Sequence, residues 1–127
     1  MNYKIGLNQS QCLAMDPLAL ANQMSEEMQF DIPTDVETKE NQKIASYTIS
    51  KATAYATFFT DMETKARLLK RAAKSAKNKE EFDRLLGVEE VFKSCKEIAK
   101  LQIENVARIM TLKRLDLDEQ KNNTRIT

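Results

Sequence analysis

Histidine is absent from this sequence, and glycine and proline are scarce. The chain of 127 residues contains two glycines, two prolines and no histidine. Without histidine it lacks the commonest general base, the commonest metal ligand and the base of most nucleophilic triads. Two isolated glycines cannot form a glycine-rich phosphate-binding loop. We therefore expect a protein that is not an enzyme and that uses no cofactor and no small-molecule substrate.

Cysteines and long hydrophobic runs are also few. Cys12 and Cys95 stand far apart, without the spacing of a disulfide framework or a zinc site. No apolar run approaches the ~20 residues that a membrane span requires. The first ten residues, MNYKIGLNQS, lack the apolar core of a signal peptide. These absences predict a cytoplasmic protein that holds no metal and does not enter a membrane.

The residues that are present favour helices. Alanine, leucine, lysine, glutamate, methionine and glutamine dominate the chain, and all of them are good helix formers. The charged fraction is 31% and the hydrophobic fraction 42%, which favours a folded helical domain over a disordered chain. We expect one all-α domain over residues 1–127, built as a long antiparallel helical hairpin with a short connecting helix at its tip and a short N-terminal helix.

Capping signals set the expected boundaries of these helices. Asp16-Pro17 is typical of a helix start, and the residue before Pro33 is pushed out of the helical region. Thr34–Glu37 and Asn78–Glu81 resemble capping boxes, and Gly87 can end a helix in the left-handed conformation. The predicted elements are a loose arm (1–15), a short helix (17–29), a long helix (35–76), a connector helix (79–86), a second long helix (88–117) and a frayed tail (118–127).

Apolar residues recur at steps of three and four along both long helices, as in helices that pack at a shallow angle. The apolar faces are wider than one partner helix requires. We expect a second copy of the chain to cover them, most simply in a dimer that forms a four-helix bundle; the alternative is a monomeric bundle with these faces folded inward. The predicted seam comprises Tyr55, Phe59, Met62, Leu69, Phe92, Cys95, Val106 and Met110.

The stretch KARLLKRAAKSAKNK concentrates positive charge. It contains seven basic residues and no acidic one, whereas residues 1–64 contain nine acidic and four basic side chains. Three interpretations stay open: contacts to the phosphates of a nucleic acid, docking on an acidic protein surface that includes a second copy, or simple solvation. The candidate polyanion-binding residues are Lys65, Arg67, Lys70, Arg71, Lys74, Lys77 and Lys79.

The N-terminal helix offers a second candidate surface. Methionine-rich amphipathic faces can serve as adaptable docking sites, and ordinary packing on the hairpin is the alternative. The candidate docking residues are Leu18, Met24, Met28 and Phe30.

These patterns lead to two functional hypotheses. The first is a non-enzymatic helical interaction protein, such as an adaptor, chaperone or inhibitor, that self-associates and binds a protein partner. The rival is a nucleic-acid-binding accessory protein that uses the basic stretch, for example in DNA packaging or replication of a phage or other mobile element. In outline, the expected hairpin is similar to small bacterial and phage proteins of both kinds, but no sequence motif carries that similarity.

Overall fold

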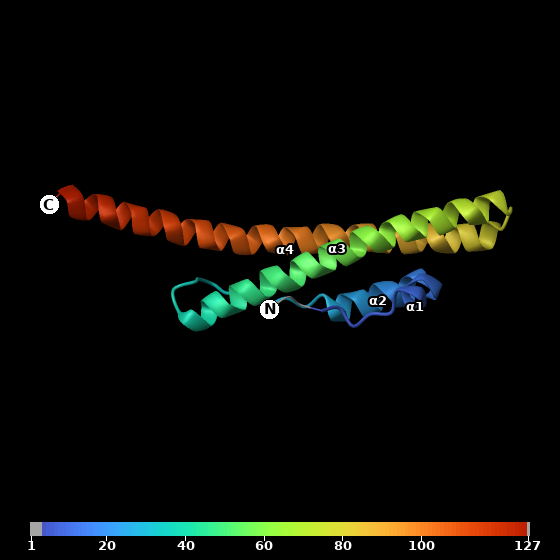
Figure 1. Ribbon diagram of the computed structural model, residues 1–127, viewed down its shortest axis with the longest axis horizontal. Helices are drawn as coiled ribbons and strands as arrows, with labels where there is room; N and C mark the ends of the chain where they lie inside the picture. Colours follow the sequence, from blue (N-terminus) through green and yellow to red (C-terminus); the bar gives the residue numbers. More distant parts are fainter. Residues whose placement is uncertain (1–3, 127) are drawn as a thin grey trace.

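In the computed structural model the described residues contain four helices, and Figure 1 shows their arrangement. The structure describes the backbone of residues 4–126 and the side chains of residues 4–112. The helices are α1 (Gln9–Ala14), α2 (Pro17–Glu27), α3 (Lys39–Ser75) and α4 (Lys79–Ile126). No strand occurs among the described residues, so the prediction of an all-α protein is confirmed.

The two long helices form the predicted hairpin. Helices α3 and α4 run antiparallel and pack against each other over much of the length of α3, while α1 and α2 lie along the side of the pair (Figure 1). The C-terminal part of α4 projects beyond the rest of the chain (Figure 1). The N-terminal helices therefore cover only the middle of the hairpin and leave its tip open.

Polar side chains cap the starts of α2 and α3. The Asp16 carboxylate accepts hydrogen bonds from two backbone N–H groups of α2, as predicted. Helix α3 begins four residues later than we expected, because Thr38 rather than Thr34 is its N-cap. Asp35 instead accepts a hydrogen bond of 3.0 Å from the backbone N–H of Glu37, which makes a local turn.

The chain reverses at the tip through a complete Schellman motif. The backbone N–H of Asn78 donates to the carbonyl of Ala73 at 2.9 Å, and that of Lys77 donates to the carbonyl of Lys74 at 3.1 Å. Lys77 takes the left-handed conformation with φ of 58°, at a position where glycine is usual. For a lysine this conformation costs roughly 1 kcal/mol. Asn78 then caps α4 by accepting from the backbone N–H of Glu81.

The predicted connector helix is not a separate element. Residues 79–86 form the first turns of α4, and Gly87 lies inside this helix without a positive φ. Its role is close packing instead, since a Cβ at Gly87 would lie 2.6 Å from Cγ of Pro17. Gly87 therefore allows the start of α2 to lie directly against α4.

Both chain ends are more helical than we expected. The N-terminal arm contains α1, which Asn8 caps by accepting from the backbone N–H of Gln11 at 3.0 Å. Arg84 of α4 donates to the carbonyls of Leu13 and Met15 at 2.8 and 2.9 Å, which satisfies backbone groups at the end of α1. At the other end, the backbone of the predicted frayed tail continues α4 to Ile126; Thr127 lies outside the described residues.

The core centres on Phe59 in the middle of the hairpin. Its ring lies 5.5 Å from that of Tyr55 on α3 and 6.1 Å from that of Phe92 on α4, measured between centroids. Leu20 and Met24 of α2 are fully buried in the same cluster. The hydroxyl of Tyr55 is held by a 2.9 Å hydrogen bond to a carboxylate of α2. The N-terminal helices thus complete a core that two helices alone would leave open.

This core contains most of the predicted seam. Six of its eight residues are buried by the packing of the chain itself, namely Tyr55, Phe59, Met62, Phe92, Cys95 and Val106. The other two, Leu69 near the tip and Met110 on distal α4, are 44% and 46% exposed. These six residues therefore serve as packing residues within the chain, and self-association stays a prediction.

Candidate functional site

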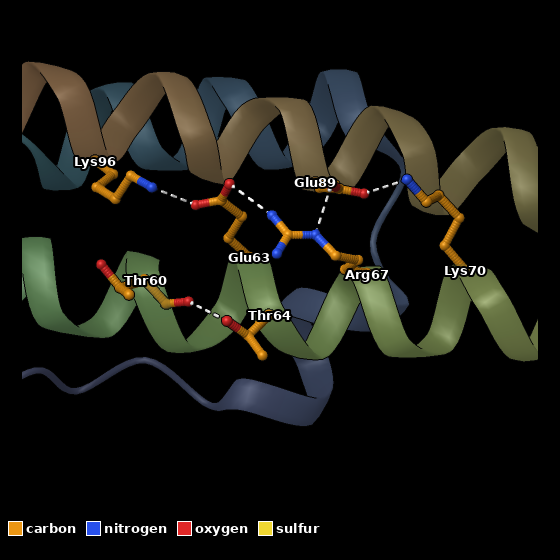
Figure 2. Close-up of polar contacts among 7 residues, drawn as sticks. All are labelled: Thr60, Glu63, Thr64, Arg67, Lys70, Glu89 and Lys96. Carbon is orange, nitrogen blue, oxygen red and sulfur yellow. Dashed lines mark hydrogen bonds and ion pairs between the residues drawn. The ribbon is translucent and has the colours of Figure 1, made fainter.

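Five charged side chains form a network between α3 and α4 (Figure 2). Arg67 bridges the helices, with Nη2 3.1 Å from Oε1 of Glu63 and Nε 3.3 Å from Oε1 of Glu89. Nζ of Lys70 lies 2.7 Å from Oε2 of Glu89, and Nζ of Lys96 lies 2.5 Å from Oε2 of Glu63. Two members of the basic stretch are therefore engaged inside the hairpin rather than presented to a ligand.

The two carboxylates of this network are largely shielded from water. Glu63 and Glu89 are 7% and 9% exposed. Burial alone raises the pKa of Glu89, but hydrogen bonds from Lys70 and Arg67 outweigh it, so the pKa lies below its ordinary value. Because a buried carboxylate needs its cations nearby, the network fixes α3 and α4 in one register.

The remaining basic residues divide between α1 and the tip. The Lys65 ammonium donates to the side-chain oxygen of Gln9, which ties α3 to α1. Arg71, Lys74, Lys77 and Lys79 are exposed and form no ion pair with any side chain that the structure describes. The seven predicted residues therefore do not act as one set: three are held within the chain, and four are exposed at or near the tip without an ion pair among the described side chains.

Three of the four free cations border a hollow at the tip of the hairpin. It has a volume of about 320 Å³ and is lined by Lys74, Lys77, Asn78, Lys79 and Phe82. The Lys70 ammonium lies 6.0 Å from the centroid of the Phe82 ring, a cation–π distance. Sequence reasoning did not include this aromatic residue among the binding candidates, because the fold, not the spacing, brings it beside the lysines.

A larger groove lies between α2 and α4. Its volume is about 470 Å³, and its lining is mostly apolar or small. The lining residues are Ala21, Ser25, Met28, Glu90, Val91, Ser94, Cys95 and Ile98. Exposed apolar side chains extend the α4 wall of this groove along the helix, with Ile98, Leu101 and Leu112 exposed by 47%, 50% and 56%.

An acidic row accompanies this apolar stripe. Glu90, Glu97 and Glu104 recur every seven residues on α4 and are all exposed. At this spacing they lie on one side of the helix, next to Ile98 and Leu101. None of the three pairs with a basic side chain among residues 4–112. The groove thus combines an apolar wall with a negative rim.

The predicted docking residues of the N-terminal helix have different positions. Met24 is fully buried in the core. Phe30 packs edge-to-face on Tyr55 at 6.3 Å and lies under the ammonium of Lys51, so it too is engaged within the chain. Only Met28 lines the groove, and Leu18, 71% exposed, extends the same stripe of α2.

Cys95 lies in the floor of the groove and is 8% exposed. Burial raises the pKa of its thiol to about 11. The thiol is therefore protonated and a poor nucleophile at neutral pH. It acts as a small apolar residue between the groove and the core.

The described residues contain no cluster suited to a metal ion. Among them, no group of three or more cysteine, aspartate or glutamate side chains could hold one. None of the described helices has an apolar stretch long enough to cross a membrane.

Comparison with known proteins returned no match. No protein-family model, no curated protein and no solved structure matches this chain. The groove, the tip and the charges of the described residues are therefore the features that bear on function.

Proposed function

We propose that this chain is a non-enzymatic helical interaction protein that binds an amphipathic helix of a partner protein in the α2–α4 groove. The observation that carries this proposal is the exposed apolar stripe that continues the groove along α4 through Ile98 and Leu101. A helix laid in a hydrophobic groove is a recurrent mode of protein recognition. The partner helix would cover apolar surface that this chain leaves exposed to water.

The groove has features that suit a helix. Two helices form its walls, so a third could lie along them as in a bundle. Small side chains line it at Ala21, Ser25 and Ser94, which favours close approach of a helix backbone. Larger apolar side chains, at Met28, Val91 and Ile98, complete the lining.

The rim favours a partner with positive charge beside its apolar face. Glu90, Glu97 and Glu104 would lie next to flanking lysine or arginine side chains of a docked helix, as charged residues do beside a coiled-coil seam. Exposed Lys93 and Lys100 lie further around α4 and reduce the net negative charge. We therefore expect the charged rim to orient the partner and the apolar stripe to supply most of the affinity.

A designed peptide tests this proposal directly. The probe is a fluorescent 21-residue helix with leucine along one face and lysine beside it, and its control is a scrambled peptide of the same composition. Ile98→Asp should weaken binding of the probe by about ten-fold or more, because it places an unpaired charge under the docked helix. Leu68→Asp is the matched control, since Leu68 is 57% exposed on α3 and lies outside the groove.

Three outcomes would count against the proposal. Equal binding of the scrambled peptide would mean that charge alone attracts the probe. Equal loss in the Leu68→Asp protein would mean that the groove is not the site. A dimer that Ile98→Asp converts to a monomer, measured by light scattering, would assign the groove to a second copy of this chain instead of a partner.

A further inference from the structure

We infer that the tip of the hairpin is a second binding site, independent of the groove, and that it takes single-stranded nucleic acid. Phosphates would contact Lys74, Lys77 and Lys79, and a base would stack on Phe82. Basic grooves with aromatic side chains are the common means of binding single strands without sequence preference.

The lining of the hollow suits an anion. Three ammonium groups and the side chain of Asn78 surround it, and no acidic residue lines it. Two of the three nearest acids along the chain point elsewhere or are paired. Glu81 pairs with Arg84, and Glu80 projects about 100° around α4 from Lys79. Asp83, which is exposed, follows Lys79 by four residues and so lies on the same side of α4, where it lowers the net positive charge beside the hollow from three to two.

Some basic residues of the stretch form ion pairs within the fold, and others do not. Arg67 and Lys70 are neutralised by buried carboxylates, whereas Lys74, Lys77 and Lys79 have no acidic partner among the described side chains. A basic side chain without an acidic partner in the fold is available to bind a phosphate, and this binding displaces counterions from the nucleic acid. These three lysines also line one hollow. If the basic residues served only to keep the surface solvated, they would not need to lie together.

The backbone at Lys77 gives a second, independent indication. This residue adopts the left-handed conformation, with φ of 58°, at the position of a Schellman motif where glycine is favoured. Lysine is therefore a costly choice for the turn itself. Strained residues gather at binding sites, and here the strain places an ammonium group at the edge of the hollow.

The presence of Phe82 in the hollow favours a single-stranded nucleic acid over a polyanion that has no bases. Its ring forms one wall of the hollow and is only partly buried. A paired base inside a duplex cannot stack on this ring, whereas an unpaired base can. The site therefore predicts a preference for single strands over duplexes of the same sequence.

The test measures binding of a fluorescent 20-nucleotide poly-dT strand by anisotropy at several salt concentrations between 50 and 200 mM. Lys77→Gly should raise the melting temperature, because glycine removes the strain, yet weaken binding. The slope of log affinity against log salt should fall in magnitude by about 0.7 for the one lost phosphate contact. Phe82→Leu keeps an apolar side chain but should weaken binding about five-fold through lost stacking.

The control is Lys100→Ala, which removes an exposed charge of α4 far from the tip and should leave the affinity unchanged. Absence of binding at 50 mM salt would overturn the inference, as would an equal loss in the control protein. Equal affinity for a duplex, or effective competition by poly-glutamate, would exclude base stacking and make the tip a general anion surface. Ile98→Asp should not affect this assay, so failure here is distinguishable from failure of the groove proposal.

Discussion

The middle and the tip of the hairpin use the same two helices in opposite ways. In the middle, α1 and α2 cover the pair, so Phe59 and Met62 are fully buried and carboxylates lie between the helices. At the tip no further helix covers the pair, so Leu69 is half-exposed and four basic side chains face water. The difference teaches that the N-terminal helices, more than the seam itself, decide which part of the hairpin is core.

The strongest test of this comparison uses two residues one heptad apart on α3. Met62 is fully buried and Leu69 is 44% exposed, although both occupy the same seam. We expect Met62→Ala to lower the free energy of unfolding by about 2–5 kcal/mol, because it leaves a cavity in a packed core. Leu69→Ala should cost less than about 1 kcal/mol. Chemical denaturation measures both, and similar losses would mean that the tip is packed like the middle.

The ion network should be the next most sensitive feature. Glu89→Gln removes the charge that holds Arg67 and Lys70, and we expect a loss of about 1–3 kcal/mol at pH 7. Glu90→Gln is the matched control, since Glu90 is exposed and unpaired among the described side chains.

The pH dependence of the Glu89→Gln effect follows from the lowered pKa of Glu89. A carboxylate with a depressed pKa in the folded state stabilises the fold above its unfolded pKa, and this contribution is lost as the pH falls through the folded value. The gap between the wild type and Glu89→Gln should therefore narrow as the pH falls below about 4.5. A gap that stays constant down to pH 2 would contradict the network as the source of the effect.

A smaller effect is expected where α2 meets α4. Alanine normally stabilises a helix relative to glycine by about 1 kcal/mol. Gly87→Ala should nevertheless destabilise the protein by about 1 kcal/mol, because its Cβ would meet the rigid ring of Pro17. Thermal unfolding measures the change, and the penalty should be smaller in a Pro17→Ala background, which lacks Cγ. A stabilised single variant would show that α2 does not depend on this close contact.

The smallest effect concerns Cys95 at alkaline pH. Its pKa is raised from about 9 to about 11, so its contribution to stability is present below pH 9 and is lost as the pH rises through 11. We compare each protein with its own stability at pH 8. Between pH 9 and pH 11 the stability of Cys95→Ala should therefore decline less steeply than that of the wild type. At pH 8.5, iodoacetamide should alkylate Cys95 much faster in urea than in the native protein. Equal rates would mean that the groove floor is open to solvent.

Much of the fold could be predicted from the local sequence. The scarcity of glycine and proline, the spacing of apolar residues and the N-caps at Asp16 and Asn78 predicted a hairpin of two long helices. The predicted reversal spread over a connector helix at 79–86, whereas the chain turns at Lys77 and Asn78. The errors fell where local signals compete. Thr34 and Thr38 both precede acidic residues, and only the turn at Asp35 decides between them. Gly87 was predicted to end a helix, because the sequence alone does not distinguish a glycine that allows close packing from one that adopts a left-handed conformation.

The candidate sites were less accessible to sequence reasoning. The basic stretch was evident, but its division was not, since the partners of Arg67 and Lys70 include Glu89, which lies on the opposite helix. A signal existed in Glu63 and Glu89, because each directly follows a buried apolar residue, Met62 and Val88 respectively. The groove depended on where α2 docks, and no local pattern fixes that position.

The sequence by itself determined that this chain forms two long helices and where positive charge accumulates along them, because these properties depend on residues a few positions apart. Only the tertiary structure decided which apolar residues are covered, which charges are neutralised and which surfaces remain open. Those outcomes depend on contacts between residues far apart in the chain, such as Pro17 with Gly87 and Glu63 with Lys96. Such contacts form only when the N-terminal helices dock on the hairpin and bury its middle.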